Sequence, residues 1–504
     1  MYLTLLIVAA ILALLAVLFV RVMSANHDTF RKMGIDTPPT SRILGNFGLS
    51  LKYGIFGSQT VFYKQFKDKK VYGWYESRRP ILIVKDLDMV KEILVKKFNC
   101  FVNRFVTFDT EPPFRDNLFI LRGDHWKQVR TLVSPTFSSA KIKTMSSHIE
   151  RNAKIMLDNL QQKQDSSECV ELREYCSYFT LDVIASTAFG LEINTLKDPK
   201  NKFVASAKAL LNPNPLVYAL VLLLPELAKV LSMLGVSVLP QKPLDYLASV
   251  VDVAIEERKR DDSGGKINDF LDLLMRAEVD QSHDTEIDAA LTRNELTRSE
   301  IHAQAIIFIF AGYDTVATVM SFTLFLLAVN PECVKKVQAE IDEQCGKDVP
   351  NHETVQGLTY LEMCISESMR LFPPATLLVR ECVQDAEIQG IHIPKDMKIF
   401  IPVYAIHTDP EQFPEPDKFD PQRFTTENKA SRHPYAYLPF GFGPRSCIGM
   451  RLAIVEMKIA IAAVLQKLIP VVCSKTVFPL RLSKIQTKAD DGLWVKFEKR
   501  NEKI

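Results

Sequence analysis

Residues Tyr437 to Ala453 read YLPFGFGPRSCIGMRLA and place one cysteine in a segment rich in glycine, proline and arginine, directly before an apolar run that predicts a helix. Five positions match the spacing F-x-x-G-x-R-x-C-x-G: Phe440, Gly443, Arg445, Cys447 and Gly449. A lone cysteine is often only a small buried apolar residue. Here, however, glycines allow close approach of the backbone to a flat group, helix-start amides lower a thiol pKa, and Arg445 offers a cation to a carboxylate. The loop therefore suits a thiolate that binds a metal within a planar cofactor.

Other familiar chemistries lack their usual patterns. The nine cysteines are scattered and include no C-x-x-C pair, which favours a reduced compartment and excludes the common zinc motifs. Ser446 stands where a dinucleotide fingerprint that begins at Gly441 needs its third glycine. Neither a Walker motif, nor H-E-x-x-H, nor G-x-S-x-G occurs. A net charge of +2 gives no reason to expect nucleic acid as a partner.

The first part of the chain predicts a membrane anchor. Residues Tyr2 to Val20 are an unbroken uncharged run that, at about 1.5 Å per helical residue, spans a bilayer core. Arg21, Arg31 and Lys32 follow it, and the positive-inside bias keeps the downstream chain in the cytosol. The alternative, a cleaved signal peptide, needs a basic start and a small-residue cleavage site. We expect a single-pass anchor at 1–21, a polar, proline-containing linker at 22–46, and one large domain at 47–504.

Most of the remaining chain has helical periodicity. A hairpin is expected within 71–86 and a second small β region within 387–404. Capping boxes are expected at Thr297 with Glu300 and at Thr359 with Glu362, and a surface loop at 260–269. The uncharged run 209–225 contains Pro213 and Pro215, which argue against a second membrane span. It is either buried core or an apolar surface that dips into the membrane and lines a route for a lipophilic ligand.

Three further patterns are weak by themselves. Trp126 and Arg130 follow W-x-x-x-R, and Glu367 and Arg370 follow E-x-x-R, which puts each pair on one helix face. Such pairs are usually packing pairs or solvated ion pairs. Residues 311–315, AGYDT, interrupt a long apolar helix with a carboxylate, which is costly there, and with a threonine that can hydrogen-bond to the previous turn. The simple alternative is a capped bend.

Together these motifs resemble, in order and over nearly the whole chain, the cytochrome P450 family, especially the microsomal family 3 enzymes and the related insect family 6. The resemblance implies a mainly α fold with small β-sheets and an N-terminal transmembrane helix, with haem b bound in 47–504. It implies that Cys447 is the axial ligand of the haem iron, since a thiolate favours O–O cleavage.

The resemblance also implies roles for other residues. Gly312 would give dioxygen room over the haem, and Asp314 and Thr315 would relay protons. Glu367, Arg370 and Arg423 (in FDPQRF) would form a buried structural network. Further residues would contact the haem, and several cations among them would bind its propionates. These residues are Arg104, Trp126, Arg130, Ala311, Arg380, Phe440, Arg445 and Gly449.

The activity implied is that of a haem-thiolate monooxygenase, which puts one atom of O2 into a lipophilic xenobiotic, steroid or fatty-acid-like substrate. Electrons would come from NADPH through cytochrome P450 reductase, sometimes with cytochrome b5, at the endoplasmic reticulum membrane. Lys127 is expected to help steer these partners. Two alternatives remain. A haem-thiolate isomerase or dehydratase typically lacks the acid-threonine pair, and a non-catalytic haem sensor needs no proton relay.

Overall fold

The computed structural model describes residues 1–106, 112–224, 226–260, 269–275 and 295–500. Most of this chain is helical, with α1 (Tyr2–Met23), α2 (Thr29–Lys32), α3 (Phe47–Gln65), α4 (Leu87–Lys91), α5 (Gly123–Val133), α6 (Ser139–Asp165), α7 (Leu172–Phe189), α8 (Lys202–Leu210), α9 (Pro215–Leu223), α10 (Leu227–Met233), α11 (Gln241–Arg260), α12 (Phe270–Met275), α13 (Arg298–Ala328), α14 (Pro331–Gln344), α15 (Thr359–Leu371), α16 (Val403–His407), α17 (Thr426–Ala430) and α18 (Met450–Lys467). The mainly helical class with small sheets is confirmed. Apart from its ends, the loop expected at 260–269 lies outside the described residues.

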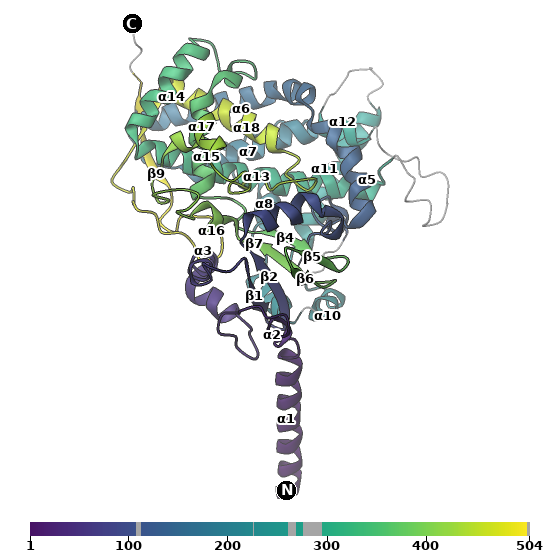
Figure 1. The fold of residues 1–504 in the computed structure, drawn as a ribbon. Helices are drawn as coiled ribbons and strands as arrows, with labels where there is room; N and C mark the ends of the chain where they lie inside the picture. Colours follow the sequence, from purple (N-terminus) through teal and green to yellow (C-terminus); the bar gives the residue numbers. More distant parts are fainter. Residues whose placement is uncertain (107–111, 225, 261–268, 276–294, 501–504) are drawn as a thin grey trace.

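The strands form small sheets at the edge of the helical body (Figure 1). One sheet has the order β1-β2-β7-β4, the second β3-β9-β8, and β5 pairs with β6. Their bounds are β1 (Val71–Glu76), β2 (Arg79–Val84), β3 (Val170–Glu171), β4 (Leu378–Glu381), β5 (Ala386–Ile388), β6 (Ile391–Ile393), β7 (Lys398–Ile401), β8 (Leu468–Val471) and β9 (Trp494–Lys499). The expected hairpin is confirmed, because β1 and β2 are antiparallel from Val71↔Val84 to Glu76↔Arg79.

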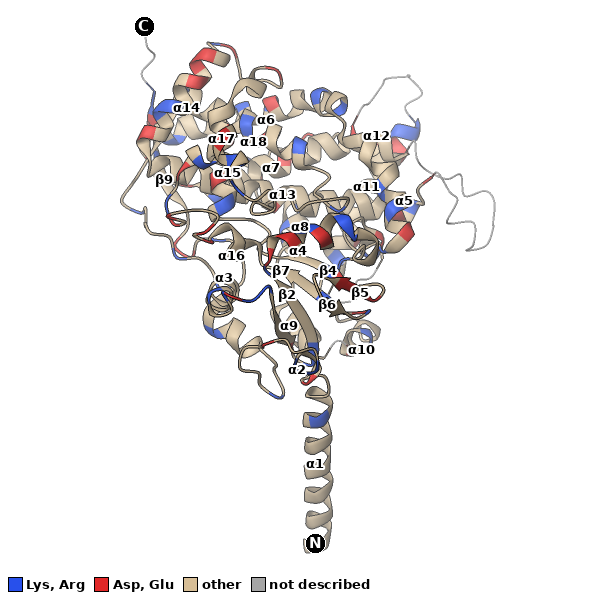
Figure 2. Cartoon of the chain, viewed as in Figure 1, with Lys and Arg blue, Asp and Glu red and all other residues tan. Residues whose placement is uncertain are grey.

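Helix α1 projects from the body, and Figure 2 shows it without charged residues apart from one basic turn close to the body. Among the described residues, two helices are long and apolar enough to cross a membrane. They differ in burial, since the apolar window of α1 is 0% buried and that of α13 is 67% buried within the body. The expectation of an apolar helix able to span a bilayer is confirmed for α1.

The segment 22–46 differs from the expected linker. Phe30 is 0% exposed and packs edge-on against Tyr75 of β1, with ring centroids 5.2 Å apart. The amide of Gly73 donates to the carbonyl of Asp36 at 2.8 Å, and the Asn46 side chain accepts from the amide of Tyr75 at 2.7 Å. This segment therefore packs onto the first sheet as part of the body, because its apolar and hydrogen-bonding groups find partners there.

Helix α13 is the 31-residue central helix, and it packs most extensively against α7. A Cβ atom at Gly312 would lie 2.5 Å from Cδ1 of Ile184 on α7. The missing side chain therefore permits the close approach of two helices. The expectation that Gly312 makes room for dioxygen stays a prediction.

The two expected capping boxes have different outcomes. At α13, Thr297 Oγ1 accepts from the amide of Glu300 at 3.2 Å, and the Glu300 carboxylate accepts from the amide of Thr297 at 2.7 Å. At α15 the expectation is wrong, because Thr359 is already helical. The Glu340 carboxylate from α14 instead accepts from the amides of Tyr360 and Leu361, at 2.7 and 3.0 Å. A carboxylate from another helix thus supplies the cap.

The described part of the uncharged run, residues 209–224, is mostly exposed or half-buried. In α9 only Val221 and Leu222 are buried, and α10 buries none of its residues. Leu216 is 80% exposed and Met233 is 84% exposed. Figure 1 shows α10 at the end of the body from which α1 emerges. The buried-core alternative is therefore wrong for this region, and the exposed apolar side chains form a surface near the anchor.

Candidate active site at the Cys447 loop

The Cys447 loop is held by backbone contacts. The amide of Cys447 donates to the carbonyl of Phe440 at 2.8 Å, and Gly449 precedes the first turn of α18. Gly443 has a φ of +75°, and a Cβ there would lie 2.1 Å from the carbonyl oxygen of Leu94. Only glycine permits this approach to the turn η1 (Glu92–Lys96). The expectation that Gly443 and Gly449 also allow close approach to a flat group stays a prediction.

The thiol of Cys447 has an unusual environment. The residue is exposed, although its thiol lies deep enough that burial raises the pKa. Three groups act in the opposite direction, namely the amide of Gly449 and the guanidinium groups of Arg104 and Arg130. Nearby positive charge and helix-start amides stabilise a thiolate. The pKa of Cys447 is nevertheless raised overall, so a bound metal cation would be what stabilises the thiolate form.

Four arginines gather beside Cys447, although they come from different elements. Arg130 lies on α5 and Arg380 on β4, while Arg445 follows Gly443 in the cysteine loop. Arg104 Nη2 donates to the carbonyl of Arg445 at 2.8 Å. Arg445 Nε donates to the carbonyl of Val102 at 2.8 Å. These contacts join residues 102 and 104 to Arg445, which lies more than 300 positions later in the chain.

The charges of these arginines are poorly compensated. Burial, together with the charges of Arg104 and Arg380, lowers the pKa of Arg445 to about 8. Burial and the charge of Arg104 lower the pKa of Arg380 to about 9. Nε of Arg380 is buried without a hydrogen-bond partner. In the part of the chain that the structure describes, none of the four arginines is ion-paired with a carboxylate. Buried cations that repel one another require anions, so this cluster fits a ligand with two carboxylates.

Trp126 belongs to the same cluster. It is 4% exposed, and the guanidinium of Arg445 lies over its ring at 4.0 Å from the centroid. Trp126 and Arg130 share the same helix, α5, as their spacing indicates. The indole thus supports Arg445 through a cation–π contact.

Helix α13 exposes a narrow strip in an otherwise buried stretch. Ala311 and Thr315 are exposed, four residues apart on one face, whereas Val316 is buried. Thr315 Oγ1 donates to the carbonyl of Ala311 at 2.6 Å. Since the hydroxyl proton is used within the helix, the oxygen presents lone pairs as acceptors. Helix α13 packs against α18, the helix that follows Cys447.

Asp314 has a partner that the sequence analysis missed. Arg173 Nη2, on α7, lies 2.6 Å from Asp314 Oδ1. Arg173 Nη1 also donates to Thr318 Oγ1 at 3.1 Å and to the carbonyl of Thr487 at 3.2 Å. A pocket of about 230 Å³ is lined by these groups together with Thr315, Pro374, Thr376 and residues 485–486. Because α7 lies far from α13 in sequence, no local spacing signals this pair.

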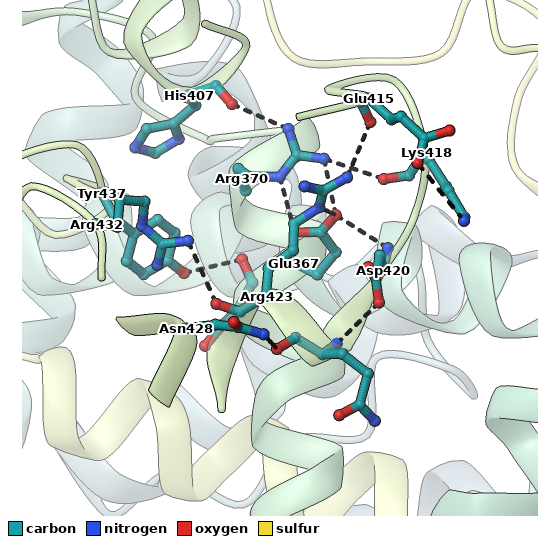
Figure 3. A network of polar contacts seen from close by, with 12 residues as sticks. Glu367, Arg370, His407, Glu415, Lys418, Asp420, Arg423, Asn428, Arg432 and Tyr437 are labelled. Carbon is teal, nitrogen blue, oxygen red and sulfur yellow. Dashed lines mark hydrogen bonds and ion pairs between the residues drawn. The ribbon is translucent and has the colours of Figure 1, made fainter. Parts of the chain in front are cut away.

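A second polar cluster surrounds Glu367 and Arg370 of α15 (Figure 3). Both side chains are 0% exposed, and two bonds of 2.7 Å join Arg370 Nη2 and Nε to the two carboxylate oxygens. Arg423 Nε lies 3.3 Å from Glu367 Oε1. Arg370 Nη1 donates to the carbonyl of His407 at 2.9 Å. In addition, Leu438, just before the cysteine loop, donates its amide to His407 Nε2 at 2.8 Å. This cluster ties α15 to the segment that leads into the loop.

Comparisons with known proteins place these features in one family. The family model for Cytochrome P450 matches residues 38–491. Cytochrome P450 3A41 of Mus musculus is 37% identical over 479 residues, which cover 94% of this chain and 93% of the mouse protein. Cytochrome P450 3A7 of Homo sapiens is 38% identical over 460 residues, which cover 90% of this chain and 89% of the human protein.

Proposed function

Because the chain belongs to the cytochrome P450 family and is a P450 monooxygenase with a haem cofactor, we propose that Cys447 is the axial ligand of its haem iron. The observation that carries this assignment is the cluster of four arginines beside Cys447, which lacks carboxylate partners among the described residues. Haem b has two propionates, which match that need. When bound, haem with a thiolate ligand supplies the activation of O2.

The chain's own groups bind and orient this cofactor. Arg104, Arg130, Arg380 and Arg445 are proposed to bind the propionates, with Trp126 packed against Arg445. Binding would supply the counter-charge that these guanidinium groups lack, and would thereby restore their ordinary pKa. Further positions are assigned to contact with the haem plane: Ala311, Phe440 and Gly449.

Proton delivery is assigned to α13. Thr315 Oγ1 would accept a hydrogen bond from a proton donor, such as a water molecule, beside the haem. Asp314 would accept a proton from water in the adjoining pocket and pass it towards Thr315. Since Arg173 holds Asp314 Oδ1 at 2.6 Å, this ion pair must loosen before the carboxylate can move. We therefore assign Arg173 as the residue that positions Asp314.

The enzyme is proposed to be a single-pass protein of the endoplasmic reticulum membrane, with residues 1–21 as anchor and the body in the cytosol. The apolar surface of α9 and α10, exposed near α1, would rest in the lipid and admit lipophilic substrates. Electrons are assigned to NADPH through cytochrome P450 reductase, with cytochrome b5 as an additional donor. Lys127 is exposed on α5 and is assigned to the docking face.

The test is the reduced, carbon monoxide difference spectrum of the membrane-expressed protein beside its Cys447→Ala variant. A strongly red-shifted Soret band that the variant loses is expected. A band that survives in Cys447→Ala, or is absent from haem-loaded wild type, would refute the ligand assignment. Turnover that requires NADPH and reductase then separates a monooxygenase from an isomerase or a sensor, because neither of these consumes external electrons.

A further inference from the structure

The sheet β3-β9-β8 brings two distant cysteines to one end. Cys169 immediately precedes β3, and Cys473 follows β8 by two residues. Both strands pair with β9, at the neighbouring positions Val170↔Val495 and Val471↔Lys496. Strand pairing thus places both cysteines at the same end of this sheet.

The two thiols interact. The neighbouring Cys473 thiol raises the pKa of Cys169, and Cys169 in turn acts to lower the pKa of Cys473. Both residues are partly exposed. By contrast, Cys333 and Cys364 are buried, at 6% and 0% exposed, and burial raises the pKa of both thiols.

Cys473 lies in a turn that stabilises a negative charge on its sulfur. The amide of Thr476 donates to the Cys473 carbonyl at 3.0 Å, and the amide of Cys473 donates to Thr476 Oγ1 at 2.8 Å. Thr476 Oγ1 also lies 3.7 Å from the sulfur. Burial acts to raise the pKa of Cys473, but hydrogen bonds from Cys169, Lys475 and Thr476 lower it below the ordinary value. A more acidic thiol beside a protonated one is the arrangement of a nucleophile and its resolving partner.

We propose that Cys473 and Cys169 form a redox-active dithiol that a small disulfide such as oxidised glutathione converts to an intramolecular disulfide. The Cys473 thiolate attacks one glutathione sulfur, so a mixed disulfide forms and the first glutathione leaves as a thiolate. Cys169 then loses its proton and attacks the Cys473 sulfur, which releases the second glutathione. Two protein thiols are oxidised, and one oxidised glutathione is reduced to two thiols. This inference is independent of the haem assignment.

The experiment uses the full-length holoenzyme in detergent, equilibrated with mixtures of reduced and oxidised glutathione. Free thiols are then blocked in acid, and disulfide-linked peptides are identified by mass spectrometry. We expect a peptide that links Cys169 to Cys473 and disappears in excess reduced glutathione. In Cys169→Ser, Cys473 should retain one glutathione, because the resolving thiol is gone. In Cys473→Ser, Cys169 should stay reduced.

Cys100 is the internal control, because it is also partly exposed. The proposal is supported if more than half of the Cys473 thiol is oxidised at a glutathione ratio that leaves most Cys100 reduced. It is overturned if no peptide links Cys169 to Cys473 where Cys100 already carries glutathione. It is also overturned if Cys473 in Cys169→Ser reacts no more than Cys100. The wild-type peptide map decides the question even if a variant fails to fold.

Discussion

The substitution Glu367→Gln removes the carboxylate that faces Arg370 and Arg423 while it keeps the shape of the side chain. The Glu367–Arg370 pair is 0% exposed on both sides and is joined by two bonds of 2.7 Å. After the change, Arg370 retains the carbonyl of His407 at 2.9 Å but loses its counter-charge. Leaving a buried charge unpaired costs about 3–5 kcal/mol. Because the hydrogen bond to His407 persists, we expect the free energy of unfolding to fall by about 3–4 kcal/mol. This lowers the folded-to-unfolded ratio roughly 100-fold to 1,000-fold.

The assay is urea unfolding of the detergent-solubilised holoenzyme, followed by far-ultraviolet circular dichroism. Glu415→Gln is the matched control, because the Glu415 side chain is 78% exposed and only its backbone carbonyl contacts Arg423, at 2.9 Å. The control should cost less than about 0.5 kcal/mol.

A double variant, Glu367→Leu with Arg370→Met, removes both charges and should recover part of the loss, because no arginine remains unpaired at position 370. A loss below about 1 kcal/mol in Glu367→Gln, or an equal loss in Glu415→Gln, would refute the reasoning.

Three further changes test other parts of the structure. Arg173→Gln should leave the carbon monoxide spectrum intact. It should lower the product formed per NADPH about tenfold and alter the solvent isotope effect, because Asp314 loses its partner. An unchanged ratio of product to NADPH would contradict the positioning role. Lys127→Glu should slow reduction by reductase several-fold and weaken its salt dependence, and an unchanged salt dependence would exclude the steering role. Glu456 on α18 is buried, and burial raises its pKa from 4.5 to about 8. Its neutral form therefore stabilises the fold fully below about pH 4.5, and this contribution is lost as the pH rises through about 8. Between these pH limits the free energy of unfolding of the wild type should fall by about 4 kcal/mol relative to that of Glu456→Gln, as measured by urea midpoints. Stability profiles of the two proteins that run parallel with pH would contradict this.

Features encoded by local spacing were predictable from the sequence. The capping box at Thr297, the β1–β2 hairpin and the apolar helix α1 depend on residues a few positions apart, and the structure contains all three. The family could be recognised for a related reason, since its motifs are short and occur in a fixed order. The Cys447 loop is the best example, because its glycines and its cysteine lie within one short segment of the chain.

Features that depend on tertiary contact were not predictable. Nothing near Asp314 in sequence indicates Arg173, and nothing near Thr359 indicates that Glu340 caps α15. Likewise, nothing near Gly312 in sequence indicates that Ile184, on another helix, packs against it. The segment 22–46 looks polar in composition, yet the burial of Phe30 and hydrogen bonds to β1 attach it to the body. In each case the deciding partner comes from a different element of the fold.

The arginines beside Cys447 also bear on how long the protein survives in a cell. A ligand that binds only the folded state stabilises it by about 2.7 kcal/mol at a hundred times its dissociation constant, and haem would in addition neutralise charges that otherwise repel one another. Newly synthesised chains without haem would unfold more often, and proteases would degrade them sooner. The amount of this enzyme should therefore follow the supply of haem through protein turnover, even at a constant rate of synthesis.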